Sequence, residues 1–266
     1  MNFPGAFPLI AVDIGNSRVK CGRFDASPSS GALELPEPTD FATIDPAAGS
    51  WDELDRLCGN APAGAFSWWI ASVQRQTTSL FVDQLRERGA SRITLVSSQV
   101  LPLEIQLPRP DMVGVDRLLG AVAASHLRGA GQGAVVVHVG TAITVNLVSA
   151  TGAFLGGAIL PGITMSARAM HQFTDLLPLI DMQSLSEPPP AVGDATLAAM
   201  TSGLYWGAVG GIKQLIELYA AQVGGDPLIL LTGGAAPSVA KLLPGHARYE
   251  PHLVLAGIAL AAAASV

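Results

Sequence analysis

The chain has 266 residues, which is enough for one large domain or two modest ones with a sizeable core. Hydrophobic residues make up 49% and charged residues only 14%, which excludes disordered and coiled-coil classes. The net charge of −6 argues against a nucleic-acid partner. No apolar stretch reaches the roughly 18 to 20 residues of a membrane-spanning helix, and the start lacks the pattern of a signal peptide. We therefore expect a cytoplasmic α/β protein without a membrane partner.

The first half of the chain alternates between strand and helix patterns. Two apolar runs around a polar turn predict a β-hairpin over residues 9–24, and residues 27–46, rich in Pro, Ser and Gly, predict a loop or irregular strands. Residues 68–72 and 93–96 predict strands, whereas residues 79–88 and 115–127 predict helices. This alternation is typical of an α/β layer architecture.

A second hairpin, over residues 134–148, repeats the first one 125 residues later. In this alignment His138 falls on Asp13, Gly140 on Gly15 and Thr141 on Asn16. The repeat predicts two related domains with a cleft between them, which we place at residues 1–115 and 116–266.

The remaining elements follow from glycine, proline and apolar patterns. Residues 154–163 are glycine-rich and predict a loop at the end of a strand, followed by a helix over residues 164–177. Residues 185–193 hold three successive prolines and predict an irregular loop. Helices over residues 196–221 and 254–264 enclose a strand over residues 227–232 that ends in Gly233-Gly234.

Glycine turns at strand ends are the main chemical signal. Backbone N–H groups in such turns bind anions, and Asn16, Ser17 and Thr141 add short donors that suit phosphate oxygens. Asp13, at the end of a strand, suits Mg²⁺, which prefers oxygen ligands and keeps several waters. Each turn alone fits a structural role, but three in order favour a phosphate site. The chain has neither a Walker loop nor a Rossmann glycine motif.

The order of the motifs resembles type III pantothenate kinases, within the superfamily of sugar and acetate kinases, actin and heat-shock chaperone ATPases. The matching segments are Asp13-x-Gly15-Asn16-Ser17, Gly114-x-Asp116-Arg117, Gly140-Thr141-Ala142, Gly156-Gly157-Ala158-x-x-Pro161-Gly162 and Thr232-Gly233-Gly234. The resemblance implies two duplicated ribonuclease-H-like domains, each a mixed five-stranded sheet with helices, with ATP in the cleft between them. It also implies a homodimer, for which the apolar helix over residues 196–221 is the candidate interface.

The resemblance also implies a role for each matching position. Asp116 would be the proton acceptor, Asp13 would lie near Mg²⁺ through water, and His138 matches the monovalent-cation position. The ATP-binding residues would be Asp13, Ile14, Gly15, Asn16, Ser17, Arg18, Val19, Lys20, Thr141, Thr232, Gly233 and Gly234. The substrate-binding residues would be Leu107, Gly114, Val115, Asp116, Arg117 and Thr196.

The chemistry of Asp116 and Arg117 can be argued without the resemblance. A carboxylate beside an alcohol can orient it and accept its proton, and a neighbouring guanidinium can bind phosphate or a substrate carboxylate. The alternative for Asp116 is a first-turn acid that interacts with the helix dipole. The resemblance favours catalysis.

Two positions depart from the family's pattern. The family usually has aspartate where this chain has His138, and often tyrosine where it has Leu107. A neutral imidazole is a poor ligand for K⁺ or NH₄⁺, so we expect a weaker dependence on monovalent cations.

Our first hypothesis is ATP-dependent phosphorylation of pantothenate to 4′-phosphopantothenate, the first step of coenzyme A biosynthesis, with Mg²⁺ as cofactor. A non-catalytic nucleotide-binding regulator on the same fold is one alternative, favoured by His138 and Leu107. A kinase for another small alcohol is a second one, because it would share every phosphate motif.

Overall fold

The described residues of the computed structural model, 5–29, 34–45, 51–59, 61–182, 187–243 and 247–265, hold ten strands in two sheets. The strands are β1 (Leu9–Ile14), β2 (Val19–Phe24), β3 (Asp40–Ile44), β4 (Ser67–Ser72), β5 (Arg92–Leu95), β6 (Ala134–Val139), β7 (Ala142–Val148), β8 (Phe154–Pro161), β9 (Leu228–Thr232) and β10 (Arg248–Tyr249). The helices are α1 (Asp52–Cys58), α2 (Arg75–Glu87), α3 (Val115–Leu127), α4 (Ile163–Gln172), α5 (Thr196–Val223), α6 (Ala236–Ala240) and α7 (Leu253–Ala264), with short 3-10 turns η2 (Ala63–Ala65), η3 (Ser98–Val100) and η4 (Pro110–Met112).

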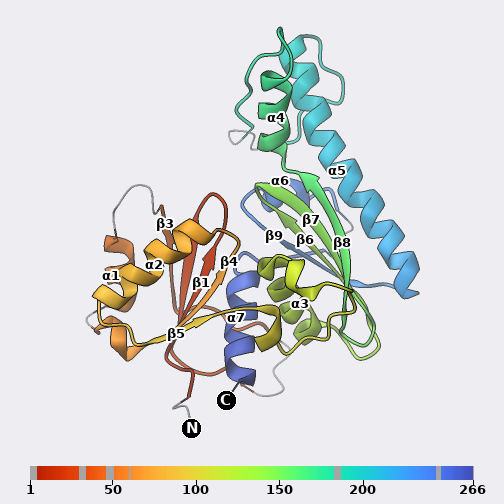
Figure 1. The fold of residues 1–266 in the computed structure, drawn as a ribbon. Helices are drawn as coiled ribbons and strands as arrows, with labels where there is room; N and C mark the ends of the chain where they lie inside the picture. Colours follow the sequence, from red (N-terminus) through yellow and green to blue (C-terminus); the bar gives the residue numbers. More distant parts are fainter. Residues whose placement is uncertain are drawn as a thin grey trace. The chain divides into compact units, whose positions relative to one another are not determined.

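The two sheets have the same topology. The first has the order β3-β2-β1-β4-β5, and the second, taken from β8, has the order β8-β7-β6-β9-β10 (Figure 1). In each sheet three consecutive strands pair antiparallel, and two later strands join parallel to the first of them. The internal duplication predicted from the two hairpins is therefore confirmed, and so is the predicted fold class of two five-stranded α/β domains.

The chain divides into two compact units, but not at the predicted boundary. Unit 1 comprises Met1–Leu127 with His252–Val266, and unit 2 comprises Arg128–Pro251. The C-terminal helix α7 thus belongs to unit 1, where a Cβ added at Gly257 would lie 2.2 Å from the carbonyl oxygen of Leu119 in α3. Only glycine permits this close contact between α3 and α7. Helix α7 also packs against β1, β2 and β4, so it belongs to unit 1 although it ends the chain. The predicted division after residue 115 is corrected accordingly.

In unit 1 the side chains of β1 alternate between two faces of the sheet. Ile10, Val12 and Ile14 join the hydrophobic core that includes Leu54 of α1 and Phe81 of α2. The other residues of β1, which end in Asp13, therefore face the opposite side, where α7 packs against β1, β2 and β4. This alternation places the one acidic residue of β1 on the side of α3 and α7.

In unit 2 the long helix α5 packs on one face of the sheet. Its buried residues recur at helical spacing and join the core formed by β6, β7 and β9. The opposite face of α5 exposes Gly203, Gly207 and Gly210, each with open space where a side chain would lie. Residues of α4 and of the chain after it form a smaller core with Met200 near the start of α5, beyond the edge of the sheet (Figure 1).

The glycine-rich segment over residues 154–163 is a strand rather than the predicted loop. β8 pairs antiparallel with β7, with a bulge beside Leu147 and Val148. A Cβ on Gly157 would lie only 2.1 Å from the carbonyl oxygen of Val145, and Gly156 has φ +105°. The glycines therefore allow a tight, irregular strand pairing that composition alone attributes to a loop.

Most other predicted elements are confirmed, with boundaries that differ by a few residues. Helix α4 ends at Gln172, short of the predicted residue 177, and the sequence did not predict α1, α6 or β10. Part of the predicted loop over residues 185–193 lies outside the described residues. Among the residues that are described, no helix combines the length and the hydropathy needed to cross a membrane.

Candidate active site

Each unit carries one hairpin whose turn begins with glycine. In unit 1 the Gly15 N–H donates to the carbonyl oxygen of Arg18, and in unit 2 the Gly140 N–H donates to that of Ala142, each over 3.1 Å. The second turn is one residue shorter, because Ile14 pairs with Val19 whereas Val139 pairs with Ile143. The first turn exposes Asn16, Ser17 and Arg18, and the second exposes Thr141. Both turns therefore present polar groups where a strand ends, as the sequence predicts.

Among the described residues of unit 1, Asp13 is the buried charged group. Its side chain is 8% exposed at the end of β1, where its cross-strand neighbours are Lys20 in β2 and Ala71 in β4. The pKa of Asp13 is raised to about 7, chiefly by burial and also by the charge of Asp116, while the charge of Lys20 lowers it. Burial and a like charge both disfavour the carboxylate, so this site would gain from a bound cation.

Asp116 lies in the first turn of α3, and its side chain folds back over Gly114. A Cβ added at Gly114 would lie 2.7 Å from Oδ1 of Asp116, while the Arg117 N–H donates to the Gly114 carbonyl oxygen over 3.1 Å. The segment from Gly114 to Arg117 therefore forms one local unit that brings Asp116 into electrostatic range of Asp13, although 102 residues separate them in sequence.

In unit 2 two glycines from distant segments pack against the turn at Gly140. The Gly162 N–H donates to the Thr141 carbonyl oxygen over 3.1 Å, and a Cβ on Gly162 would lie 2.3 Å from that oxygen. Gly233, with φ +103°, would place a Cβ 2.3 Å from the carbonyl oxygen of Val139. The structure thus brings the motifs around Gly140, Gly162 and Gly233 together. Sequence reasoning noted Gly162 but gave it no role, and only its position after Pro161 signalled a strand end.

The other predicted substrate residues lie in different places. Leu107 is half-buried in the segment before η4, where Arg109 and Asp111 form a surface ion pair at 2.7 Å. Thr196 is exposed in the first turn of α5, in the part of unit 2 formed by α4 and α5. No described hydrogen bond ties Thr196 to the turn at Gly140.

Comparison with known proteins identifies the family. The model of the type III pantothenate kinase family matches residues 9–218, which is well over half of the chain. The chain belongs to the type III pantothenate kinase family. A member from Parafrankia sp. (strain EAN1pec) is 30% identical over 95% of this chain and 96% of its own. One from Acidiphilium cryptum (strain JF-5) is 39% identical, but the matched region spans 58% of that protein.

Solved structures agree on the fold. A Campylobacter jejuni protein described as a conserved Baf family transcriptional activator aligns over 94% of both chains with a TM-score of 0.58 at 19% identity. A Sinorhizobium meliloti protein described as a 2-dehydro-3-deoxygalactonokinase covers 96% of this chain with a TM-score of 0.53 at 18% identity. At such identities the likeness concerns the fold alone.

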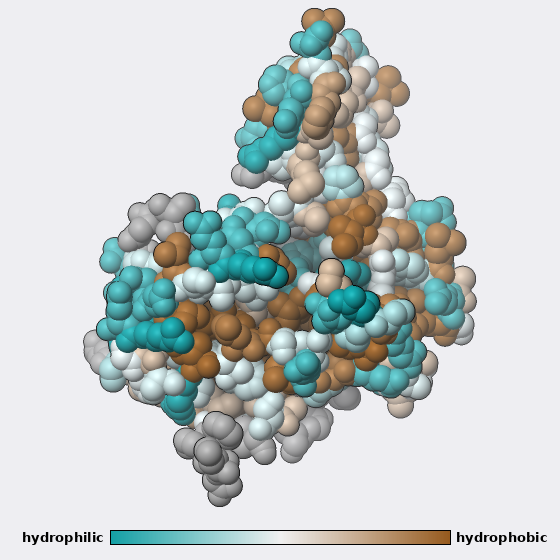
Figure 2. Space-filling view, viewed as in Figure 1, coloured by the Kyte–Doolittle hydropathy of each residue, from teal (hydrophilic) through white to brown (hydrophobic). Residues whose placement is uncertain are grey.

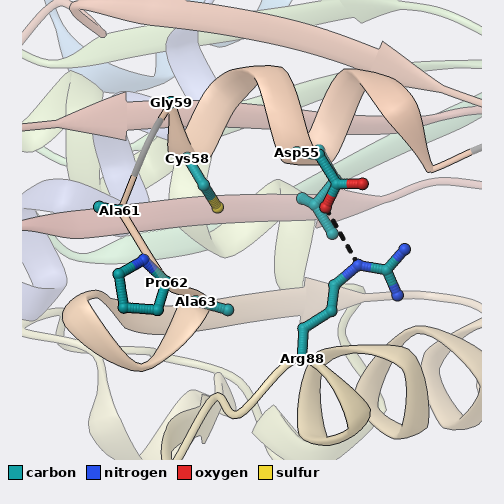
Figure 3. Close-up of a pocket in the computed structure, with 8 residues that line it drawn as sticks. Asp55, Cys58, Gly59, Ala61, Pro62, Ala63 and Arg88 are labelled. Carbon is teal, nitrogen blue, oxygen red and sulfur yellow. Dashed lines mark hydrogen bonds and ion pairs between the residues drawn. The ribbon is translucent and has the colours of Figure 1, made fainter.

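A pocket of about 210 Å³ lies elsewhere in unit 1 (Figure 3). It is lined by α1, by η2 and by Arg88, whose Nε donates to Oδ1 of Asp55 over 3.2 Å. Leu54 and Cys58 in its wall belong to the core on the face of the sheet opposite Asp13. This pocket is therefore separate from the candidate active site.

Proposed function

We propose that the protein transfers the terminal phosphoryl group of ATP to the primary hydroxyl of pantothenate, giving 4′-phosphopantothenate and ADP. The observation that carries this proposal is the electrostatic interaction of Asp116 with buried Asp13 in a member of this kinase family. The reaction is the first step of coenzyme A biosynthesis, and we assign it to the cytoplasm.

In this proposal Asp116 is the catalytic residue. Phosphoryl transfer depends chiefly on positioning and on neutralising phosphate charge, and the attacking alcohol must lose its proton. Asp116 orients the hydroxyl and accepts that proton as the new bond to phosphorus forms and the bond to ADP breaks. The absence of a side chain at Gly114 leaves the space that the Asp116 carboxylate occupies.

We assign the contacts with ATP to the glycine turns and strand ends. The residues from Asp13 to Lys20 contact its phosphates, with Asn16 and Ser17 as donors and Lys20 as a cation. Thr141 contributes a further phosphate contact. We assign Thr232, Gly233 and Gly234 to the adenosine end of the nucleotide; Gly234 is exposed, whereas Thr232 is buried.

Pantothenate is bound by the segment from Gly114 to Arg117, with Arg117 suited to its carboxylate. We assign further contacts to Leu107 and Thr196. Leucine lacks a hydroxyl, so any contact from Leu107 is apolar.

The residues present fit Mg²⁺. One or two protein carboxylates, completed by phosphate oxygens and waters, are enough for this ion, and buried Asp13 is the carboxylate that would hold it through water. When bound, Mg²⁺ supplies neutralisation of the phosphate charge. Within the described part of the chain, no group of three or more His, Cys, Asp or Glu residues gathers as a metal site.

We also propose a homodimer that uses the exposed face of α5. Gly203, Gly207 and Gly210 leave open space along it, and small residues allow close helix contacts. Phe173 and Leu176, just after α4, are 79% and 91% exposed, and Figure 2 shows hydrophobic side chains at the outer end of this region. Such apolar exposure favours a partner surface.

The test of the proposed function is ADP release coupled to a spectrophotometric readout, with and without pantothenate, and with a panel of other small alcohols. Release that depends on pantothenate supports the proposal. ATP binding without release on any alcohol would support a non-catalytic regulator, and release on a different alcohol would support another kinase.

A further inference from the structure

The ring of His138 lies between the two glycine turns of unit 2. A Cβ built on Gly140 would be 3.3 Å from its Nε2 and 3.5 Å from its Cδ2, and one built on Gly233 would be 2.8 Å from its Cδ2. The Nε2 edge of the ring thus meets the turn after β6 on one side and the turn after β9 on the other. These are the turns to which we assign nucleotide contacts.

The side chains beside His138 are polar and uncharged. In the sheet, His138 pairs with Thr144 of β7 and with Thr232 of β9, so the three form one row across three strands. Thr144 and Thr232 are 9% and 3% exposed, and buried Asn146 donates to the hydroxyl of Thr144 over 3.1 Å. A buried polar row at strand ends suits a polar ligand better than it suits a hydrophobic core.

The duplication gives a direct comparison within the chain. The corresponding row of unit 1 is Lys20, Asp13 and Ala71, so a carboxylate stands where unit 2 has the imidazole. An ionised carboxylate can only accept hydrogen bonds, so it meets a phosphate through a cation, as we propose for Asp13. An imidazole that carries hydrogen on Nε2 can donate one, in the imidazolium form and in one neutral tautomer.

We propose that the Nε2–H of His138 donates a hydrogen bond to a phosphate oxygen of the bound nucleotide. The inference rests on the proposed function only in that a nucleotide binds unit 2 at these turns. It makes His138 a nucleotide-binding residue in this chain.

Two substitutions distinguish the loss of the Nε2–H donor from the loss of the volume of the His138 ring. His138→Ala removes the donor, and we expect it to weaken ADP binding, measured by calorimetry at fixed pH, by about tenfold. His138→Gln places an amide N–H near the position of Nε2, and we expect affinity within a few-fold of the native protein. His171→Ala is the control, because His171 is exposed on α4 and its Nδ1 contacts only the Leu177 carbonyl in the described structure.

Equal losses in the alanine and glutamine variants, or no loss in either, would overturn the proposal. Should the alanine variant fail to fold, the ¹⁵N resonance of Nε2 in the native protein gives the answer, with His138→Gln providing its assignment. A shift on addition of ADP supports the contact, and an unmoved resonance refutes it. If ADP binding depends on His138 while pantothenate is not phosphorylated, the proposed function fails and this inference stands. If pantothenate is phosphorylated while ADP binding does not depend on His138, this inference fails and the proposed function stands.

Discussion

Asp13 at the end of β1 and Asp116 in the first turn of α3 place two carboxylates within electrostatic range in unit 1. Burial makes the larger contribution to the raised pKa of Asp13, and the charge of Asp116 adds to it. Each group therefore has a distinct environment: Asp13 is buried in the sheet, whereas Asp116 is half-exposed. This difference suits Asp13 to a cation and Asp116 to a substrate hydroxyl.

Replacing Asp116 tests the catalytic assignment. Asp116→Asn keeps the shape of the side chain but cannot accept the proton, so turnover should fall by roughly 10²- to 10⁴-fold. ATP affinity should stay within a few-fold. The control is Asp111→Asn, whose carboxylate is exposed and paired with Arg109. Near-normal turnover in Asp116→Asn would remove Asp116 from the mechanism.

Gly114 controls the position of the Asp116 carboxylate. Gly114→Ala brings a Cβ to 2.7 Å from Oδ1, so the carboxylate must move while the fold is retained. Because a displacement of about 1 Å at a reacting group costs on the order of 10² in rate, we expect turnover to fall by about 10- to 100-fold with little change in the melting temperature. Gly225→Ala, where a Cβ meets open space, should be silent. Unchanged kinetics in Gly114→Ala would argue against this positioning role.

The stability of the ligand-free protein should depend on Asp13. Its pKa of about 7 in the folded state exceeds the ordinary 3.8, so the folded state binds the proton more tightly. The contribution to the free energy of unfolding is therefore fully present below about pH 4 and is lost as pH rises to about 7, by on the order of 4 kcal/mol.

Asp13→Asn removes this dependence. Denaturant melts without nucleotide or Mg²⁺ should show the variant more stable than the native protein near pH 8, with a smaller difference near pH 4. Asp83→Asn, on the exposed surface of α2, is the matched control. A native protein that is more stable than Asp13→Asn at pH 8 would contradict the prediction.

Dependence on monovalent cations should be weak. His138 stands where the family resemblance implies an aspartate, so we expect activity with tetramethylammonium chloride to approach that with KCl at equal ionic strength. In His138→Asp, activation by K⁺ should appear. A strict K⁺ requirement in the native protein would defeat this expectation.

The oligomeric state tests the exposed face of α5. Light scattering should give twice the 27.3 kDa monomer mass at micromolar concentration. Gly207→Arg introduces a large charged side chain where the native helix has open space, so it should yield a folded monomer. Gly225→Arg, in open space beyond the end of α5, should remain dimeric. A native monomer would refute the dimer.

The sequence by itself determined the duplication, because two strand–turn–strand patterns 125 residues apart specify two hairpins through apolar runs and glycine turns alone. It also predicted the glycine turns and the position of Asp116 in the first turn of a helix. These are local properties of the chain, set by hydrophobic periodicity and turn chemistry.

Only the tertiary structure decided what depends on contacts between distant segments. Helix α7 belongs to unit 1, where Gly257 lies close to Leu119. The glycine-rich segment forms β8, in which Gly157 lies close to Val145 of β7. The tertiary structure also brought Asp116 within range of Asp13. For α7 and β8 the physical reason is the same: a glycine in the sequence marks a missing side chain, but only the folded backbone shows which neighbour occupies that space.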